Sequence, residues 1–182
     1  MDDQDNTEPS DSDAWIRKAL SDFESDLMRY ASGLLAGDIN RARDLVQECY
    51  LRLCKQDRRQ VEGHIGEWLF RVCRNGALDI QRKENRMTNL DEEARATPSP
   101  ASPPESALEQ ADELELVMGA LNSLPPKQQE ALRLKFQYGH TYKEIARITE
   151  ETVGTVGWLI HEGLGALRLR LKVHDQANGA KV

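Results

Sequence analysis

Long apolar runs are missing from the sequence. No stretch comes near the roughly 18–20 apolar residues that a helix needs to span a bilayer, so we expect no membrane segment. The acidic stretch Met1–Asp13 also lacks a basic segment followed by an apolar one, which a secretory signal requires. Both absences predict a cytoplasmic protein.

Residues that carry catalysis are scarce as well. Cys49, Cys54 and Cys73 are odd in number and form no CxxC pair, so they are expected to pack as small hydrophobic residues rather than to form disulfides. None of the four histidines has metal-ligand spacing, and the sequence contains no glycine-rich phosphate loop, serine nucleophile motif or paired-carboxylate motif. We therefore predict no enzyme, no bound metal and no cofactor.

The net charge of −7 is distributed unevenly along the chain. Residues 1–40 carry 3 basic and 10 acidic side chains, and residues 87–122 carry 1 and 8. By contrast, residues 41–86 carry 11 basic and 7 acidic side chains, and residues 123–182 carry 9 and 6. An acidic sequence thus contains two basic blocks, a distribution that leaves nucleic acid open as a partner.

A proline-rich stretch separates the two basic blocks. Ala96–Pro104 holds four of the seven prolines and has no apolar periodicity, which is typical of a stiff, extended linker. We predict an all-α chain with five parts: a disordered acidic tail (1–13), a first helical domain (14–87), an acidic and proline-rich linker (88–107), a second helical domain (108–174) and a short tail (175–182).

In the first domain, residues 41–55 have the apolar spacing of a helix. The predicted buried stripe consists of Ala42, Leu45, Val46, Cys49 and Leu53. The opposite face carries Asp44, Gln47, Glu48, Leu51 and Lys55. Charged helix faces are usually just solvated, but a leucine on such a face is a mild anomaly.

A second helix is predicted over residues 67–83. Its predicted buried side consists of Leu69, Val72, Cys73, Gly76 and Ile80. The other side presents Arg71, Arg74, Asn75, Leu78 and Arg82, and guanidinium and amide groups offer the paired hydrogen bonds that suit phosphates and base edges. Before it, the segment Gln56–Gly66 reads as a mobile loop with Arg58, Arg59, Gln60 and His64. A solvated face remains an alternative, yet the basic loop beside a basic helix favours nucleic acid.

The second domain is predicted to contain a helix-turn-helix. A helix over Leu108–Leu121, with Leu114, Val117 and Leu121 as its apolar stripe, precedes Pro125, and the next helix directs Ala131, Leu132 and Phe136 inward. Thr141 and Glu144 form a capping box for a short helix that buries Ile145, Ala146 and Ile148. A turn follows, and the last helix runs from about Gly154 to Val173 and has Val156, Ile160, Leu164, Leu167 and Leu171 on one face.

Four segments of the sequence resemble a known family. Residues 42–51 (ARDLVQECYL) and 68–79 (WLFRVCRNGALD) resemble region 2 of bacterial sigma factors of the extracytoplasmic-function group. Residues 124–129 (LPPKQQ) and 142–146 (YKEIA), continuing to the GTV triplet at 154–156, are similar to region 4 of the same family. The resemblance covers roughly residues 20–173.

The resemblance implies a partner for each surface. Core RNA polymerase would bind through its clamp helices at Asp44, Gln47, Glu48 and Leu51 and through its flap at region 4. The minus-ten promoter element would be contacted by Arg58, Arg59, Gln60, His64, Arg71, Arg74 and Asn75, with an unpaired base captured by the loop. The minus-thirty-five element would be contacted by Thr141, Lys143, Arg147, Thr155, Trp158 and His161. Asp91, Glu92 and Glu93 of the linker would lie near the RNA path, and an anti-sigma protein is a further expected partner.

The sequence departs from the family after the GTV triplet. Family members usually place basic residues and a serine there, whereas this chain has Gly157, Trp158, Leu159 and Glu162. A helical projection puts Glu151, Thr155, Trp158 and Glu162 outward, so this face lacks the cations that grip phosphate. The last helix either still binds DNA, which we favour, or contacts a protein through the exposed tryptophan.

These observations predict a sigma factor that binds core polymerase and directs promoter recognition and melting without catalysing a reaction itself. The alternative is a helix-turn-helix regulator or a protein-binding adaptor that works without polymerase holoenzyme. Such a protein would not need the acidic face around Asp44 and Glu48 or the basic loop. A net charge of −7 also predicts that the free chain binds DNA weakly.

Overall fold

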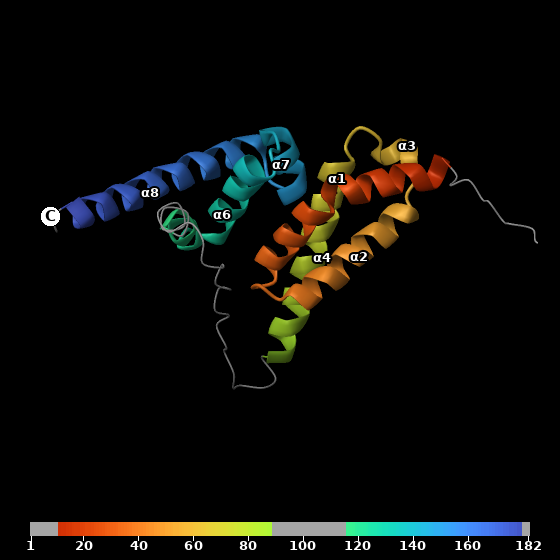
Figure 1. Cartoon of the computed structure of the whole chain (residues 1–182), viewed down its shortest axis with the longest axis horizontal. Helices are drawn as coiled ribbons and strands as arrows, with labels where there is room; N and C mark the ends of the chain where they lie inside the picture. The colour runs from red at the N-terminus through yellow and green to blue at the C-terminus, as the bar shows by residue number, and fades with distance from the viewer. Residues whose placement is uncertain (1–10, 89–115, 180–182) are drawn as a thin grey trace, which may run out of the picture. The chain divides into compact units, whose positions relative to one another are not determined.

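The computed structural model describes residues 11–88 and 116–179. Within these two ranges the chain forms helices and turns and contains no strand, which confirms the all-α prediction. The described residues belong to two compact units, drawn in Figure 1, one with helices α1 to α4 and one with helices α6 to α8. No helix in the described ranges has the length and apolarity needed to cross a membrane.

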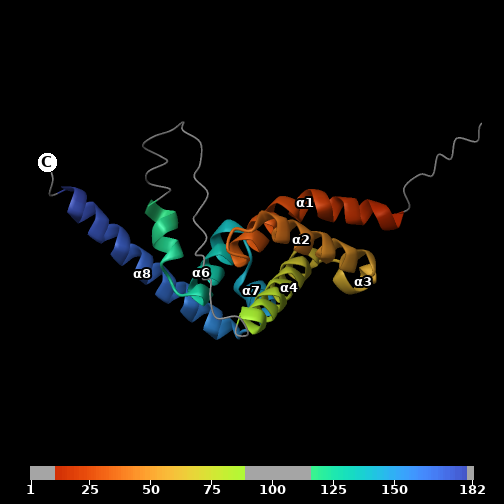
Figure 2. The same ribbon diagram turned by 90° about the horizontal axis from the view of Figure 1, so that it is seen from below.

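Three long helices form the first unit. Helices α1 (Asp11–Leu34), α2 (Ile39–Cys54) and α4 (Ile65–Thr88) pack against one another, as both ribbon views show, and the short α3 (Arg58–Val61) precedes α4 (Figures 1 and 2). The core contains Leu27, Leu53, Leu69 and Phe70, and the ring of Phe70 lies 5.0 Å from that of Tyr30. Helix α1 starts at Asp11, inside the stretch that we expected to be a disordered tail.

The predicted buried stripe of α2 is confirmed. All five of its members are buried, because the helix follows a regular period and is covered on one side by α1 and α4. In α4, Leu69 and Cys73 are buried, whereas Val72, Gly76 and Ile80 are half-buried. A Cβ at Gly76 would lie 2.5 Å from Cδ1 of Leu45, so this glycine allows α2 and α4 to approach closely.

The cysteine prediction is confirmed at two of three positions. Cys49 and Cys73 are free and fully buried, and a hydrogen bond of the Cys73 thiol with Cys49, together with burial, raises the pKa of Cys73. Cys54 is exposed, because it follows Leu53, the last buried residue of the stripe, at the end of α2. The packing prediction is therefore wrong for Cys54.

The second unit contains the predicted helix-turn-helix. A helical segment over residues 116–122 is followed by α6 (Pro126–Leu132), the π-helix η1 (Arg133–Gln137), α7 (Tyr142–Thr149) and α8 (Val153–Gly179). The side chains of Leu134, Ile145, Ile148, Val156 and Ile160 form its core. Helix α8 continues into residues 175–179, which we expected to belong to a tail.

Two apolar residues of this unit lie outside the core, contrary to prediction. Phe136 is 64% exposed, because the π-helix winds the chain more slowly than an α-helix and turns Leu134 inward instead. Val117 is 41% exposed, since its helix lies at the edge of the unit, where no residue from 116 to 122 is fully buried. Leu121 is half-buried, and Leu114 and the predicted linker lie outside the described residues.

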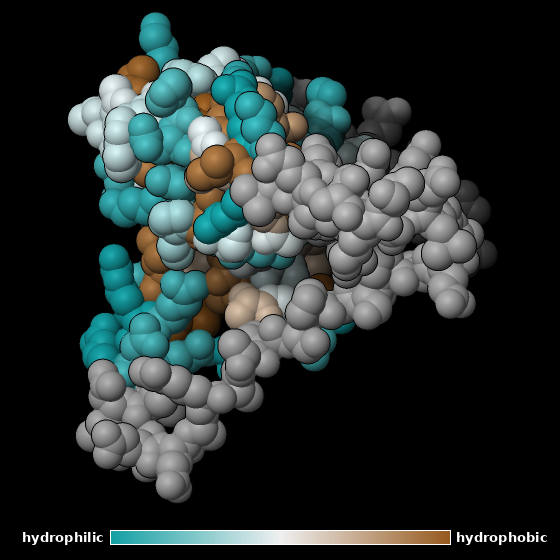
Figure 3. Space-filling model, turned by 90° about the vertical axis from the view of Figure 1, so that its left-hand side faces the viewer, coloured by the Kyte–Doolittle hydropathy of each residue, from teal (hydrophilic) through white to brown (hydrophobic). Residues whose placement is uncertain are grey.

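Hydrophobic side chains also reach the surface of the protein. Figure 3 shows brown patches among hydrophilic residues on one face. Among the large hydrophobic residues of the described ranges, the most exposed are Leu169, Phe136, Trp158 and Leu51, at 67%, 64%, 58% and 56%. Two of these four, Leu51 and Trp158, belong to surfaces that the sequence marks as functional.

Candidate functional sites

The outer face of α2 is open to solvent. Asp44, Gln47, Glu48 and Leu51 are all exposed and lie on one side of the helix, as predicted. The Glu48 carboxylate accepts a hydrogen bond from Nε of Arg52 at 2.9 Å, and because both groups are exposed this pair contributes less than about 1 kcal/mol. An apolar side chain among acidic and amide groups has the composition of a small protein-contact surface.

The segment before α4 is more ordered than we predicted. Instead of a mobile loop, Arg58–Val61 forms the short helix α3, with the Asp57 side chain accepting a hydrogen bond from the backbone N–H of Arg59 at 3.0 Å. Val61 is 1% exposed and ties this turn to the core. The prediction of an irregular loop is therefore wrong for residues 58–61, because the Asp57 N-cap and the buried Val61 favour a helical turn there.

Most polar side chains of this segment point to solvent. Arg59, Gln60 and His64 are exposed, whereas Arg58 is half-buried and bonds to Glu62 at 3.2 Å. The amide of Gln56 donates a hydrogen bond to the side-chain oxygen of Gln60 at 2.8 Å. The segment thus presents a group of polar side chains, and its helix α3 lies directly before the start of α4 (Figure 1).

Helix α4 carries the predicted basic row. Arg71, Arg74 and Asn75 are half-buried neighbours at helical spacing, and Arg82 further along is exposed and pairs with Asp79 at 3.3 Å. Because half-burial already restricts these side chains, binding a ligand would cost less of their conformational entropy. The helix is held by the amide of Gln81, which donates a hydrogen bond to the carbonyl of Leu34 at 2.6 Å.

A capping box begins the first helix of the helix-turn-helix. The backbone N–H of Thr141 donates to Oε2 of Glu144 at 2.7 Å, and Oγ1 of Thr141 accepts from the N–H of Glu144 at 3.3 Å. These bonds with Thr141 hold the pKa of the Glu144 carboxyl below its usual value, and nearby His140 and Arg147 lower it further. The predicted box is confirmed, and it occupies the Thr141 hydroxyl that we assigned to DNA.

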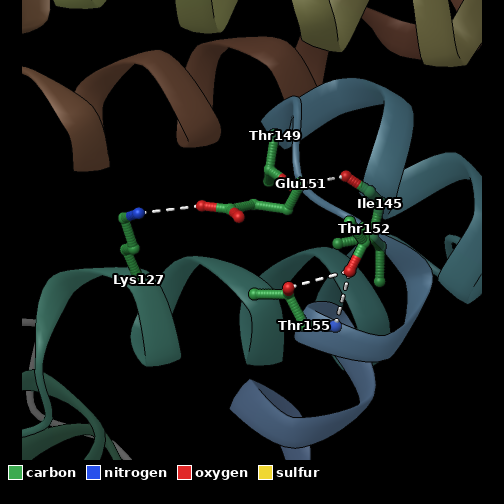
Figure 4. A network of polar contacts seen from close by, with 6 residues as sticks. All are labelled: Lys127, Ile145, Thr149, Glu151, Thr152 and Thr155. Atoms are coloured by element: carbon green, nitrogen blue, oxygen red, sulfur yellow. Dashed lines mark hydrogen bonds and ion pairs between the residues drawn. The ribbon is translucent and has the colours of Figure 1, made fainter.

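The turn between α7 and α8 is fixed by polar contacts, which Figure 4 shows from close by. Nζ of Lys127 in α6 lies 2.8 Å from Oε1 of Glu151. The hydroxyl of Thr152 accepts a hydrogen bond from the N–H of Thr155 at 3.1 Å and caps α8, and it lies 2.8 Å from the Thr155 hydroxyl. The hydroxyl of Thr149 donates to the carbonyl of Ile145 at 2.7 Å.

These contacts change two predictions about the outward face. Glu151 lies before α8 and turns back to Lys127, so its placement on the outer face of the last helix is wrong. Thr155 is half-buried and its hydroxyl is engaged by Thr152, because the turn needs an N-cap. Neither side chain projects freely toward a partner.

The remaining candidates of this unit are exposed. Lys143 and Arg147 lie on the exposed side of α7, and Trp158, His161 and Glu162 on that of α8. Leu159, which replaces a basic residue of the family pattern, is 6% exposed and belongs to the core. No Lys or Arg occurs between Arg147 and Arg168. The cations of the helix-turn-helix therefore come from its first helix.

The sequence interpretation missed an aromatic residue beside this surface. Tyr142 is 39% exposed, and Nζ of Lys135 lies 5.6 Å from the centre of its ring. A Cβ at Gly157 would lie 3.8 Å from Cε2 of Tyr142, so the ring covers this part of α8. A Cβ at this distance would be in ordinary van der Waals contact, so Gly157 gave no sequence signal for the position of the ring.

Among the described residues, no three His, Cys, Asp or Glu side chains come together in a way that could hold a metal ion. The two units instead present exposed polar and basic helix faces, one of them on a helix-turn-helix. These features define an all-helical protein of the class that binds partners through helix surfaces.

Comparison with known proteins identifies the two units. The family model "Sigma-70 region 2" matches residues 20–87, and "Sigma-70, region 4" matches residues 114–167. The ECF RNA polymerase sigma factor SigL of Mycobacterium tuberculosis is 30% identical over 167 residues, which cover 87% of this chain and 90% of SigL. The chain belongs to the extracytoplasmic-function (ECF) sigma factors.

Other relatives are matched over part of their length. SigE of Mycolicibacterium smegmatis is 32% identical over 78% of this chain and 56% of SigE, and EcfG of Rhodopseudomonas palustris is 34% identical over 67% of this chain and 66% of EcfG. Among solved structures, the sigma factor RpoE from Bartonella quintana, in complex with the anti-sigma factor NepR, is similar with a TM-score of 0.71 and 26% identity. That match covers 86% of this chain and 96% of RpoE.

Proposed function

We propose that this protein is a promoter-specificity subunit that binds core RNA polymerase and directs promoter recognition and melting at the start of transcription. The single observation that carries the proposal is the pairing of two sigma regions, each with an exposed polar helix face, in one chain. The role requires no catalysis by the chain itself. It places the protein in the cytoplasm, where transcription occurs.

The outer face of α2 is the proposed polymerase contact. Its acidic groups supply charge for the contact with the clamp helices. Leu51 supplies apolar surface whose burial in the contact would be favourable. The flap is the proposed partner of the second unit. An anti-sigma protein is a further proposed partner, since the similar RpoE is found in a complex with one.

The two units share the proposed contact with promoter DNA. In the first, Arg71, Arg74 and Asn75 would approach the minus-ten element together with the exposed Arg59, Gln60 and His64 and the half-buried Arg58. Arginine and asparagine side chains give bidentate hydrogen bonds that suit both phosphates and bases. In the second, Lys143, Arg147, Trp158 and His161 would approach the minus-thirty-five element.

Core binding can be tested directly on the α2 face. We expect the double variant Asp44→Ala/Glu48→Ala to bind core polymerase at least about tenfold more weakly, because removing a charged interface group commonly costs more than about 1.4 kcal/mol. Fluorescence anisotropy of labelled protein titrated with core enzyme measures this affinity. The matched control is Asp22→Ala, which removes an exposed carboxylate from α1 instead.

Two results would contradict this assignment. One is a wild-type protein that shows no saturable binding to core polymerase, which would exclude the proposed role altogether. The other is equal loss of affinity in the Asp22 control, which would show that overall charge and not the α2 face carries the contact.

A further inference from the structure

The first part of α8, from residue 153 to 165, exposes two side chains that can hydrogen-bond to bases, His161 and Glu162, and neither is a lysine or an arginine. Its solvent-facing positions from the start of the helix to residue 165 are Val153, Gly154, Trp158, His161, Glu162 and Gly165, which we call the α8 outer face. The chain has no Lys or Arg between Arg147 and Arg168, so the paired donors that recognise guanine are missing from this face. The hydroxyl of Thr155 is already engaged by Thr152 at 2.8 Å.

Trp158 dominates the α8 outer face. It is 58% exposed, and Gly154, one turn earlier, and its neighbour Gly157 have no side chains that would shield its ring. Packing does not require either glycine, since a Cβ at Gly154 or Gly157 would meet its nearest atom only at 3.8 Å. Gly163 differs, because a Cβ there would lie 2.8 Å from Cδ1 of Leu132.

The charges beside this face favour DNA over a protein as its occupant. Lys143 and Arg147 are exposed on α7, the helix that crosses the phosphate backbone when the second helix of such a motif enters the major groove. The cations on the first helix would hold the phosphates, and the tryptophan on the second would face the bases. The apolar group that the major groove offers is the 5-methyl group of thymine.

We infer that Trp158 is a specificity-determining residue that packs against thymine methyl groups in the upstream promoter element. This inference rests on the proposed function and adds the chemistry that the second unit recognises. Trp158 recognises a base by apolar contact and therefore selects thymine. It does not need the hydrogen bonds to guanine that lysine and arginine side chains make. Selectivity of this kind has a distinctive signature, because deoxyuridine keeps every hydrogen-bonding group of thymine and lacks only the methyl.

The test uses the full-length protein in holoenzyme with core polymerase. A promoter is first selected from a library randomised in the upstream element, and its thymines there are then replaced by deoxyuridine. We expect the replacement to weaken wild-type holoenzyme about fourfold for each contacted methyl, the value for burying one such group. Trp158→Ala is expected to bind the thymine promoter as weakly as wild type binds the uracil promoter, and to show no further loss with uracil.

Two more variants make the test specific. Trp158→Phe keeps an aromatic ring and should retain part of the sensitivity to uracil. Leu169→Ala removes a side chain that is 67% exposed on the same side of α8 but about three turns beyond Trp158, so it should behave as wild type. Circular dichroism of each variant checks that the helices are intact.

Three outcomes would overturn the inference. Wild-type holoenzyme that binds both promoters equally excludes methyl recognition, and undiminished sensitivity to uracil in Trp158→Ala assigns it to another residue. Unchanged promoter binding by Trp158→Ala would indicate that the tryptophan serves a protein contact. In each case the holoenzyme still initiates and the proposed function stands, whereas failure to form holoenzyme contradicts both.

Discussion

Two glycines in α8, Gly163 and Gly165, have opposite effects on the stability of this helix. Gly163 is buried against α6, and a Cβ there would lie 2.8 Å from Cδ1 of Leu132 and 3.3 Å from its Cγ. Gly165, half a turn further along, is exposed with no atom within 4 Å of the corresponding position. Only the first glycine is required by packing.

Alanine substitution should separate the two glycines. Gly165→Ala is expected to stabilise the second unit by about 1 kcal/mol, the helix propensity difference between the two residues. Gly163→Ala should destabilise it, because overpacking costs typically 1–3 kcal/mol and exceeds that gain. Thermal unfolding followed by circular dichroism measures both changes. Stabilisation by both variants would show that α6 and α8 do not approach as closely as the structure has them.

Residue exposure was predictable wherever a helix is regular. All five members of the α2 stripe are buried and the four candidates on its outer face are exposed, because a period of 3.6 residues fixes which side chains share a side. Phe136 could not be placed in this way, since the π-helix breaks the period. Glu151 could not either, because its partner Lys127 lies 24 positions earlier in the sequence.

At the scale of elements, caps and turns determine how the functional helices are presented. The capping box of α7 was readable from the spacing of Thr141 and Glu144, and Asp57 gave an equally good N-cap signal for α3 that we did not use. The same caps use part of the hydrogen-bonding capacity of the hydroxyl groups at Thr141 and Thr155. Polar residues at helix starts could therefore be expected either to cap the helix or to bind DNA, and in the structure they cap the helix.

The capping box should make the stability of α7 depend on pH. The pKa of Glu144 is lowered in the folded state, so its ionised form stabilises the helix fully above its ordinary pKa of about 4.3. This contribution is lost as the pH falls through the lowered pKa of the folded state. We expect Glu144→Gln to remove that part of the acid sensitivity, at a cost of no more than about 1 kcal/mol at neutral pH, because glutamine also serves in a capping box.

Urea unfolding between pH 3 and pH 7 measures this dependence. Glu162→Gln is the matched control, since it neutralises an exposed carboxylate in α8 that makes no part of the box. An acid profile of Glu144→Gln identical to that of the wild type would contradict the role given to the carboxylate.

On the scale of the whole molecule, charge and division into two units support the proposed dependence on polymerase. The net charge of −7 repels DNA at long range, although residues 41–86 and 123–182 are basic. Binding of both units to one enzyme, as proposed, would place each near its own promoter element and would raise the effective concentration of the second contact. The free chain should therefore bind promoter DNA much more weakly than the holoenzyme does.

The family was predictable from the sequence, because its motifs occur in order and are matched over residues 20–87 and 114–167. The orientation of single side chains in the second unit was less predictable. The placement of its side chains depends on a π-helix, two threonine caps and an ion pair between α6 and the turn, each of which joins residues that a simple helical projection treats as independent.

Run-off transcription with purified core polymerase tests the central claim most directly. We expect that core enzyme alone yields no specific transcript and that the wild-type protein directs transcripts from a defined start. The double variant Arg71→Ala/Asn75→Ala should lower their yield at least about tenfold while core binding is kept, because each lost bidentate contact is worth about 1–3 kcal/mol. Wild-type protein that binds core polymerase but gives no specific transcript from any fragment of its own genome would contradict it.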